Sequence, residues 1–544
     1  MVRSPNRGSL HNVSTSAFSF DGAAVLRWAR LATAGLRAQR SRMDDLNVFP
    51  VADSDTGTNL LLTFTDGAAA LERLAASTPN LEAGPALVSL ARGALRGARG
   101  SSGTILSQLL LGFAEEVASE ETVDRDSFAR ALVSAADTAW EAVSEPVAGT
   151  ILSVARACAD AAVEYAEDAS LSTAAVVART VSSSREALIA TQNQLPVLRR
   201  AGVVDAGGLG LVVLFDALLA TVRGESDLPD LEHSMRAIPT EVASQPVEQE
   251  LVPLTGPSVL QHHMEPDEHR VDGEFEVMFL VEDPSPTAGH ELRRGLQQVG
   301  SSVVVVGGAG LWQVHVHCDD VLAALAVADG ESRRQVTVHH LPTLVNRRER
   351  SDVGLVLCTR SPGLAGELAR SGAVVVVTSG DEVPSVVQLS RAIVDVGAST
   401  VVVGVARAES LAAAEQVVAP PGLSIRVIPQ CGEVQLLAAA AVHQFERTDD
   451  HDPRKAIDDA VKRVHAFQGV PQRSELEEIL RSGELVTAVV GGEDLASSIE
   501  ASQGLVSAAE RSLADVSALC EDFDAELVVL YGGQEAPSFI IGVE

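Results

Sequence analysis

Apolar residues recur at three- and four-residue spacing from about Phe18 to Arg223, in segments rich in Ala and Leu. Examples are residues 69–76, 128–143 and 151–167. This spacing is the period of an α-helix with one apolar face, and no convincing strand pattern interrupts it. We therefore predict an all-helical domain over residues 18–223, whose long helices leave their connecting loops at one rim.

The pattern changes after this region. Residues 224–272 are rich in Pro, Glu, Gln, Ser and His with little periodicity, which predicts a linker. Residues 275–280 and 313–317 then alternate between apolar and polar side chains, as strands do, around a helical pattern at residues 292–299. We predict a middle α+β domain over residues 273–348.

Short β-branched runs separated by helical stretches characterise residues 349–544. Such alternation is typical of parallel strands crossed by helices, so we predict a C-terminal α/β domain. The expected strands are residues 354–358, 373–378, 400–405 and 425–428, followed by a late strand from Glu526, and residues 364–370 are an expected helix.

Length and charge narrow the function. A chain of 544 residues is too long for one core, which agrees with about three domains. Its formal net charge of −33, from 74 acidic and 41 basic residues, argues against a nucleic-acid or anionic-membrane surface. The five cysteines have no C-x-x-C spacing and predict reduced thiols. Without an apolar run of roughly 20 residues or a signal-peptide core, we expect a cytoplasmic protein with no stable membrane insertion.

Two carboxylates, Asp53 and Asp55, lie two residues apart in the segment Asp53-Ser54-Asp55-Thr56-Gly57-Thr58-Asn59, which runs into an apolar helix. Mg²⁺ prefers hard oxygen ligands together with phosphate oxygens, and a helix N-terminus offers unpaired N–H groups to the same anion. The segment therefore indicates a magnesium and nucleotide-phosphate site. The alternative is a solvated turn and helix cap, for which these residue types are also common.

Three further turns combine glycine with hydroxyl or carboxyl side chains between helices: residues 98–106, 149–152 and 201–208. Glycine lets a backbone come close to phosphate or ribose, and hydroxyl and N–H groups bind oxygens. Each turn alone is also consistent with a plain interhelical connection.

Only two lysines occur, Lys455 and Lys462, and both are far from these turns in the sequence. P-loop and protein-kinase folds need a phosphate-binding lysine, so both are excluded. Phosphate charge must then be balanced by metal ions, N–H groups and arginine. Arg99 either assists there or is an exposed surface arginine.

His315 and His317 lie two residues apart on a predicted strand. Residues at this spacing face the same side, so both imidazoles can reach one ion. Cys318 is a weaker candidate ligand because it should face the opposite side.

The order and the residues of the four turns resemble those of the nucleotide-binding, DhaL-type domain of the dihydroxyacetone kinase family, and most closely those of its fatty acid kinase branch. The resemblance implies an all-helical antiparallel barrel that binds ATP and magnesium at one end. It implies Asp53 and Asp55 as magnesium ligands. It also implies a nucleotide site lined by Asn47, Thr56, Asn59, Ser101, Ser102, Thr150, Asp205 and Gly207.

The same resemblance extends, more weakly, along the rest of the chain. In the fatty acid kinases the corresponding histidines look like zinc ligands together with a cysteine, and Glu276 aligns with that cysteine. The resemblance thus implies a zinc site at Glu276, His315 and His317. The C-terminal α/β domain is similar in fold to fatty-acid-binding proteins.

We therefore expect an ATP- and Mg-dependent kinase that phosphorylates a fatty acid, presented by a fatty-acid-binding protein, to an acyl phosphate. One alternative is a dihydroxyacetone or other small-polyol kinase, which would need a separate substrate protein. Another is a nucleotide-binding regulatory scaffold. A homodimer is expected from resemblance only.

Overall fold

The computed structural model describes most of the chain. The described residues are 20–51, 54–225, 273–283, 285, 287–308, 310–328, 332–345, 353–379, 382–428, 431–445, 453–463, 465–468, 485–491, 526–533 and 539–543. Most of the predicted linker, from residue 226 to residue 272, lies outside this set.

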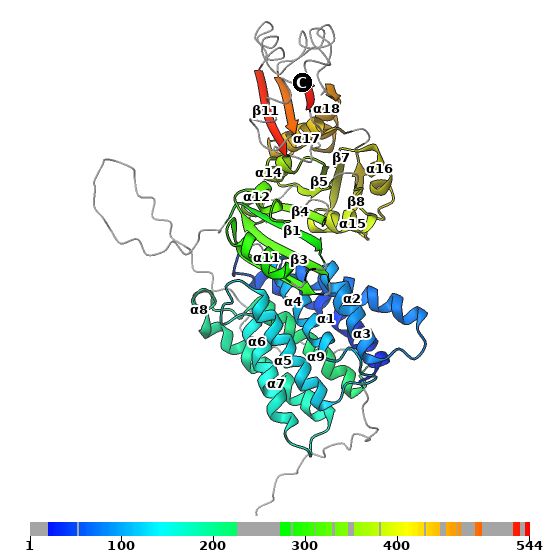
Figure 1. Cartoon of the computed structure of the whole chain (residues 1–544), viewed down its shortest axis with the longest axis vertical. Helices are drawn as coiled ribbons and strands as arrows, with labels where there is room; N and C mark the ends of the chain where they lie inside the picture. The colour runs from blue at the N-terminus through cyan, green and yellow to red at the C-terminus, as the bar shows by residue number, and fades with distance from the viewer. Residues whose placement is uncertain are drawn as a thin grey trace, which may run out of the picture.

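A closed ring of helices forms the N-terminal part of the molecule (Figure 1). Each long helix packs against its neighbour in the chain, and α9 packs against both α7 and α1, which closes the ring. The all-helical prediction for this region is confirmed. Its helices are α1 Gly22–Leu46, α2 Thr56–Ser77, α3 Ala83–Arg96, α4 Gly100–Glu116, α5 Arg125–Ala142, α6 Ile151–Ala166, α7 Thr173–Gln194, the short α8 Pro196–Ala201, and α9 Ala206–Arg223.

Side-chain caps fix several of these helix starts. Asp21 accepts from the N–H of Ala24 at the start of α1, and Asp124 and Ser127 form a reciprocal capping box at the start of α5. Such caps satisfy N–H groups that have no partner within the helix. Local sequence therefore determines where helices begin.

The inside of the ring is apolar. It contains a cavity of about 70 Å³ lined by Leu, Phe and Ala side chains and by Trp28. Of the described helices, α9 is long and apolar enough to cross a membrane, but 83% of it is buried within the protein. Helix α9 is therefore a buried member of the helical ring.

An eight-stranded mixed sheet lies above the ring in Figure 1, with strand order β2-β3-β1-β4-β6-β5-β7-β8. The first half is antiparallel, and the second half is parallel from β6 onward. Together with the helical ring, the sheet confirms the multidomain α and α/β class. The strands are β1 Phe275–Glu282, β2 Gly300–Gly308, β3 Leu311–Cys318, β4 Arg333–His340, β5 Val353–Thr359, β6 Val374–Val377, β7 Thr400–Val405 and β8 Ser424–Val427.

This sheet continues across the predicted boundary between residues 348 and 349. Val336 to Val338 of β4 pair in antiparallel register with Val375 to Val377 of β6. The division into middle and C-terminal domains remains a prediction. What the structure describes is one set of paired strands shared by both regions.

One face of the sheet packs directly on the helical ring. Val304 and Val306 of β2 belong to the core cluster of the ring, and the N–H of Ser144 donates to the carbonyl of Val303 at 3.1 Å. Phe275 and Val277 of β1 and their neighbours form a separate core. The alternation of side chains along each strand therefore gives the sheet one face toward the ring.

The remaining described elements cover the sheet or extend the chain. Relative to the predicted helix at 292–299, α11 begins and ends earlier, and β2 and β4 were not predicted. The helices are α11 Ala288–Leu296, α12 Val321–Leu325, α13 Leu341–Val345, α14 Ala365–Arg370, α15 Val386–Asp395, α16 Ala408–Glu415, α17 Glu433–Phe445 and α18 Pro453–Arg463. A second sheet has the order β11-β10-β12-β9, with β9 His465–Gln468, β10 Leu485–Gly491, β11 Glu526–Gly533 and β12 Phe539–Val543.

Candidate functional site

The carboxylate turn lies at the start of α2. Asp55 is the N-cap residue of this helix, and its carbonyl accepts from the N–H of Asn59 at 2.8 Å. Thr56 and Asn47, both predicted nucleotide contacts, are buried beside the turn. Asp53, the other predicted magnesium ligand, lies outside the described residues.

A second acid, which sequence reasoning missed, holds this turn in place. Asp44 near the end of α1 accepts from both the backbone N–H and the hydroxyl of Thr58, each at 2.9 Å. Burial raises the pKa of Asp44, although the bonds from Thr58 oppose that shift. The pair Asp44-Asp45 stood in the sequence just before Asn47, but it carried no motif.

The second predicted turn meets the first at the start of α4. Gly100 has a positive φ of 56°, and a Cβ atom there would lie only 2.3 Å from the Asn59 amide nitrogen. The hydroxyl of Thr63 on α2 accepts from the N–H of Arg99 at 3.1 Å. The two turns therefore touch, and they place half-buried Ser101 and Ser102 in the first turn of α4 beside Asn59.

The third and fourth turns also meet. Asp205 caps α9 by accepting from the N–H of Gly208 at 2.7 Å, and it also accepts from the N–H of Ile151 at the start of α6. Burial raises the pKa of Asp205 to about 6, against these two bonds, which lower it. Thr150, the N-cap residue of α6, donates its hydroxyl to the carbonyl of Val147.

Close packing also joins the two pairs of turns. Within the second pair, a Cβ on Gly207 would approach the Cβ of Ile151 to 3.3 Å. Between the pairs, a Cβ on Gly210 of α9 would lie 2.3 Å from a methyl group of Leu60 on α2. In a ring of antiparallel neighbours, α2, α4 and α6 begin at the same end, and α9 joins them there through these contacts. Four helix N-termini at one end give a concentrated set of N–H donors for anions.

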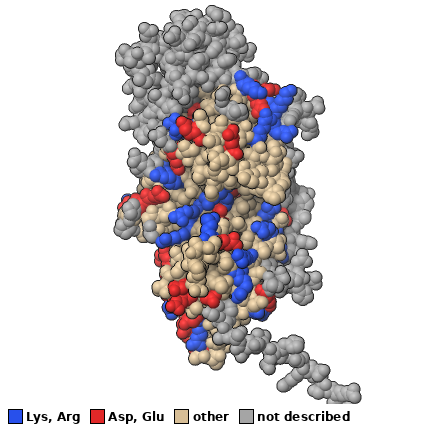
Figure 2. Space-filling model, turned by 90° about the vertical axis from the view of Figure 1, so that its right-hand side faces the viewer, with Lys and Arg blue, Asp and Glu red and all other residues tan. Residues whose placement is uncertain are grey.

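A pocket of about 60 Å³, the junction pocket, lies where this end of the ring meets the sheet. The ring contributes Asp55, Thr58 and Asn59, and the sheet contributes Glu276 and His339. Helix α15 supplies a third wall with Gln388, Arg391 and Asp395. Figure 2 shows basic side chains gathered at the waist of the molecule, between its helical and α/β parts.

Arg99 connects two of these walls. Its Nε lies 2.8 Å from the carboxylate of Asp395 on α15, and its Nη1 lies 3.4 Å from Asp66 on α2. Arg391 reaches the same Asp66 carboxylate at 3.0 Å. Arg99 is buried, so the alternative of an exposed surface arginine was wrong.

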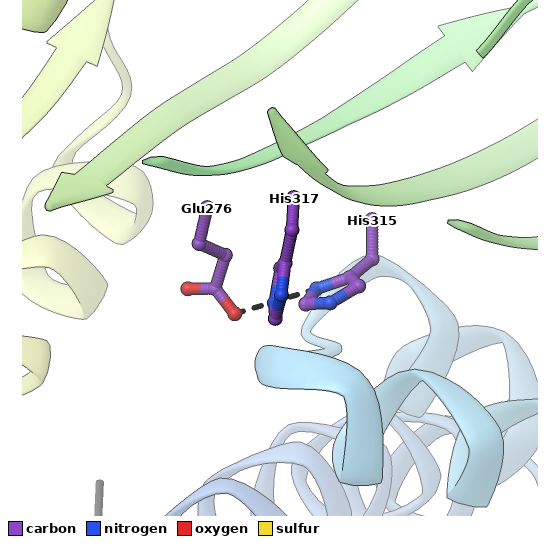
Figure 3. Close-up of side chains that lie close together, drawn as sticks. All are labelled: Glu276, His315 and His317. Carbon is purple, nitrogen blue, oxygen red and sulfur yellow. Dashed lines mark ion pairs between the residues drawn. The ribbon is translucent and has the colours of Figure 1, made fainter. Parts of the chain in front are cut away.

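The sheet face toward the ring carries the predicted metal ligands. Glu276 of β1 pairs with His317 of β3, and their neighbour His315 lies on the same face. The Nδ1 of His315 is 3.3 Å from a Glu276 oxygen, and one ligand atom from each of the three residues lies within 4.8 Å of the others. Figure 3 shows all three side chains directed from the sheet toward the helices of the ring.

Burial shapes the charge of this cluster. Burial alone would raise the pKa of Glu276, but the hydrogen bond from His339 and the charges of the histidines outweigh it and lower the pKa to about 2. Burial lowers the pKa of His315, and it lowers that of His317 to about 3. The lowered pKa values of His315 and His317 favour the neutral imidazoles that metal binding requires.

The donor set fits a zinc ion. Both ring nitrogens of His315 are buried without a hydrogen-bond partner among the described residues. A carboxylate with two imidazoles is an established zinc-ligand combination. Cys318 is directed into the other core, as the strand alternation predicted.

His339 on β4 was missed by sequence reasoning. Its Nδ1 lies 2.8 Å from the second oxygen of Glu276, and its Nε2 has no hydrogen-bond partner among the described residues. Only recognition of β4 as the neighbour of β1 could have placed it there. Because Glu276 and His339 both line the junction pocket, the histidine cluster and the start of α2 border one cavity.

Two ranges of the chain match models of known protein families. Residues 50–220 match the model of the DAK2 domain, and residues 272–340 match that of the FakA-like middle domain of fatty acid kinases. Protein YloV of Bacillus subtilis is 30% identical over 439 residues, which cover 76% of this chain and 74% of YloV. An uncharacterized protein of Staphylococcus aureus is 28% identical over 410 residues, or 70% of each chain.

Among solved structures, the dihydroxyacetone kinase from C. freundii in complex with AMP-PNP and Mg²⁺ is 15% identical. The match covers 41% of this chain and 37% of that chain, with a TM-score of 0.29. A TM-score this low supports no conclusion about this chain.

Proposed function

Since the chain belongs to the dihydroxyacetone kinase (DhaL-type) family, in its fatty acid kinase branch, we propose that it is an ATP- and magnesium-dependent phosphotransferase. Its proposed acceptor is the carboxylate of a fatty acid presented by a binding-protein partner. The product is an acyl phosphate.

The observation that carries the proposal is the gathering of four helix N-termini at one end of the ring, with Asp55 at the start of α2. The N–H groups of these turns, together with Asn59, Ser101 and Ser102, offer hydrogen bonds to phosphate oxygens. No lysine occurs in this part of the chain, so backbone N–H groups, hydroxyl and amide side chains, and arginine are its own means of binding phosphate.

The carboxylate of Asp55 fits a hard divalent cation, and Asp53 is proposed as its companion ligand. Magnesium, when bound, neutralises charge on phosphate oxygens. Asp44 keeps the turn in place through Thr58, so the carboxylate is presented by a fixed segment.

The acceptor needs little activation. A fatty acid carboxylate is already ionised at neutral pH, so the chain must orient it and exclude water rather than remove a proton. A polyol hydroxyl would need a base, which makes dihydroxyacetone the informative comparison substrate.

The test is ATP-dependent acyl phosphate formation, trapped with hydroxylamine. Purified protein is given Mg²⁺, oleate and a fatty-acid-binding protein from the same cell, with dihydroxyacetone in a parallel reaction. We expect product from oleate, and a loss of about 100-fold or more in Asp55→Ala. Asp21→Ala, which removes a capping acid from the start of α1, is the matched control and should keep its turnover.

Two results would contradict this proposal. Turnover of dihydroxyacetone alone would replace the fatty acid proposal with a polyol kinase. No turnover of either substrate, with unchanged nucleotide binding in Asp55→Ala, would contradict the kinase site.

Zinc at Glu276, His315 and His317 is proposed as a structural ion. It would hold β1 and β3 together on the face that meets the ring. Elemental analysis should find about one zinc per chain in the parent and none in the double variant His315→Ala with His317→Ala. A parent purified without chelators that holds no zinc would contradict the assignment.

A further inference from the structure

Helix α15 presents three polar side chains to the junction pocket. Gln388, Arg391 and Asp395 follow one another at spacings of three and four residues, which places them on one face of the helix. This face belongs to the region after residue 349, far in sequence from the nucleotide turns. The pocket is incomplete without it.

Gln388 is the unexplained residue of this wall. It is only 4% exposed, and its side-chain nitrogen has no hydrogen-bond partner among the described residues. Its backbone N–H is satisfied separately by the hydroxyl of Ser385. A buried amide donor without an acceptor is unfavourable, so the pocket is built to receive an acceptor atom.

Arg391 lies one helical turn further on and is held firmly. Its Nη1 donates to the carbonyl of Arg96 at 2.7 Å and to the side chain of Gln335 at 2.8 Å, while Nε faces Asp66. These contacts come from the ring and from β4, so the guanidinium is fixed at the seam between them. A fixed guanidinium costs little entropy when it binds oxygen.

The acids near this wall already have cationic or imidazole partners. Asp395 pairs with Arg99, and Glu276 is in contact with His315 and His339. Asp66 is shared by two arginines. Asp395 and Asp66, the acids closest to Arg99 and Arg391, are therefore already paired with guanidinium groups.

The size of the pocket limits its ligand. A volume of about 60 Å³ suits a group of a few heavy atoms. An amide N–H beside a guanidinium matches the oxygens of a phosphoryl or carboxylate group.

We propose that the junction pocket is an oxyanion site, in which Gln388 and Arg391 of α15 bind a phosphoryl or carboxylate group opposite Asp55. The identity of that group rests on the proposed kinase function. It is either the terminal phosphoryl group of the nucleotide or the carboxylate of the acceptor. The α/β region then adds Gln388 and Arg391 to the donors of the helical domain.

The direct test measures binding of inorganic phosphate and of acetate to the full chain by calorimetry. Gln388→Glu keeps the size of the side chain but replaces the donor with a negative charge. We expect it to weaken binding of at least one anion tenfold or more. Ser390→Ala is the control on the same helix, because the Ser390 hydroxyl donates to the Val386 carbonyl one turn earlier in α15. The anion affinity of this variant should stay within twofold of the parent.

If the parent binds neither anion, or if Gln388→Glu binds both as well as the parent, the proposal is wrong. Circular dichroism of each variant establishes that a loss of binding is not a loss of folding. Gln388→Leu, which removes the donor without adding charge, should give a smaller loss in the same direction.

Two further measurements separate the sources of the oxyanion. If the site takes the terminal phosphoryl group, Gln388→Glu weakens Mg²⁺·AMP-PNP about tenfold and changes Mg²⁺·ADP less than twofold. If it takes the acceptor, both nucleotides bind normally and the KM for the acyl acceptor rises. A parent that binds inorganic phosphate but no nucleotide would overturn the proposed kinase function and leave the oxyanion site standing.

Discussion

The two sides of the junction pocket are built in opposite ways. The helical side comes from short turns that each combine a cap, a glycine and a polar side chain, with Asp55, Asn59 and Gly100 in contact. The α/β side takes single side chains from β1, β4 and α15, across more than a hundred residues of sequence. One side is encoded locally, and the other exists only after the sheet has formed.

The chemistry of the two sides differs as well. The ring supplies a carboxylate and helix N-termini, which suit a cation and the phosphates that accompany it. The α/β side supplies an amide, a guanidinium and imidazoles, which suit oxyanions or a transition metal. A reaction that involves both a metal cation and an oxyanion therefore needs both sides of the junction pocket.

The largest expected effect concerns the buried acid of the helical side. The pKa of Asp205 is raised from 3.8 to about 6, so the folded chain holds this proton more tightly than the unfolded chain. The stability it contributes is fully present below pH 3.8 and is lost as the pH rises through about 6. Asp205→Asn removes this loss, which amounts to about 3 kcal/mol over the interval.

The measurement is the free energy of unfolding in urea for parent and variant from pH 4 to pH 7. The difference between the two proteins should change across this range, with the parent losing more stability. Parallel curves would mean that the carboxyl of Asp205 is not desolvated.

A second prediction compares two glycines with positive φ. Gly100→Ala and Gly202→Ala should each cost about 1–2 kcal/mol, because both force an L-residue into the left-handed region. Only at Gly100 would the new Cβ displace a side chain, that of Asn59. Nucleotide affinity, measured by calorimetry, should therefore fall in Gly100→Ala alone.

Equal nucleotide affinity in Gly100→Ala and Gly202→Ala would contradict this prediction. It would mean that contact between the first two turns has no part in binding. Thermal unfolding of both proteins is measured alongside, and the close contact with Asn59 should make the loss of stability larger in Gly100→Ala.

The smallest expected effect tests the ion pair that connects the helical side of the junction pocket with the α/β side. A double-mutant cycle with Arg99→Ala and Asp395→Ala should give a coupling free energy of about 1 kcal/mol, because the pair is largely buried between α4 and α15. Urea unfolding of the four proteins measures it. A coupling near zero would show that this ion pair does not hold the two sides together.

The helical side could be read from sequence because caps and turns are local. The residues around Asp55, Ser101 and Asp205 were identified, and the structure brings them to neighbouring helix starts. Asp44 was missed because its role depends on the end of α1 lying beside the first turn of α2. The nucleotide and magnesium roles of these residues remain predictions.

The α/β side could be read only in part. His315 and His317 were found because their spacing is visible within a single strand. His339 was missed because Arg333–His340 is a polar segment with little strand character, although it pairs with β1 on both sides of an irregularity in the register. Gln388 and Arg391 gave no signal, since an amide and an arginine on a helix usually face solvent.

The pairing of β4 with β6 has a practical consequence for dissecting this chain. A fragment ending near residue 348 would keep the helical ring and β1 to β4, but it would strip β4 of its neighbour and expose the backbone groups of Val336 to Val338. Unpaired strand edges recruit other strands. Such a fragment should self-associate, so domain deletions will misreport oligomeric state unless the cut spares the sheet.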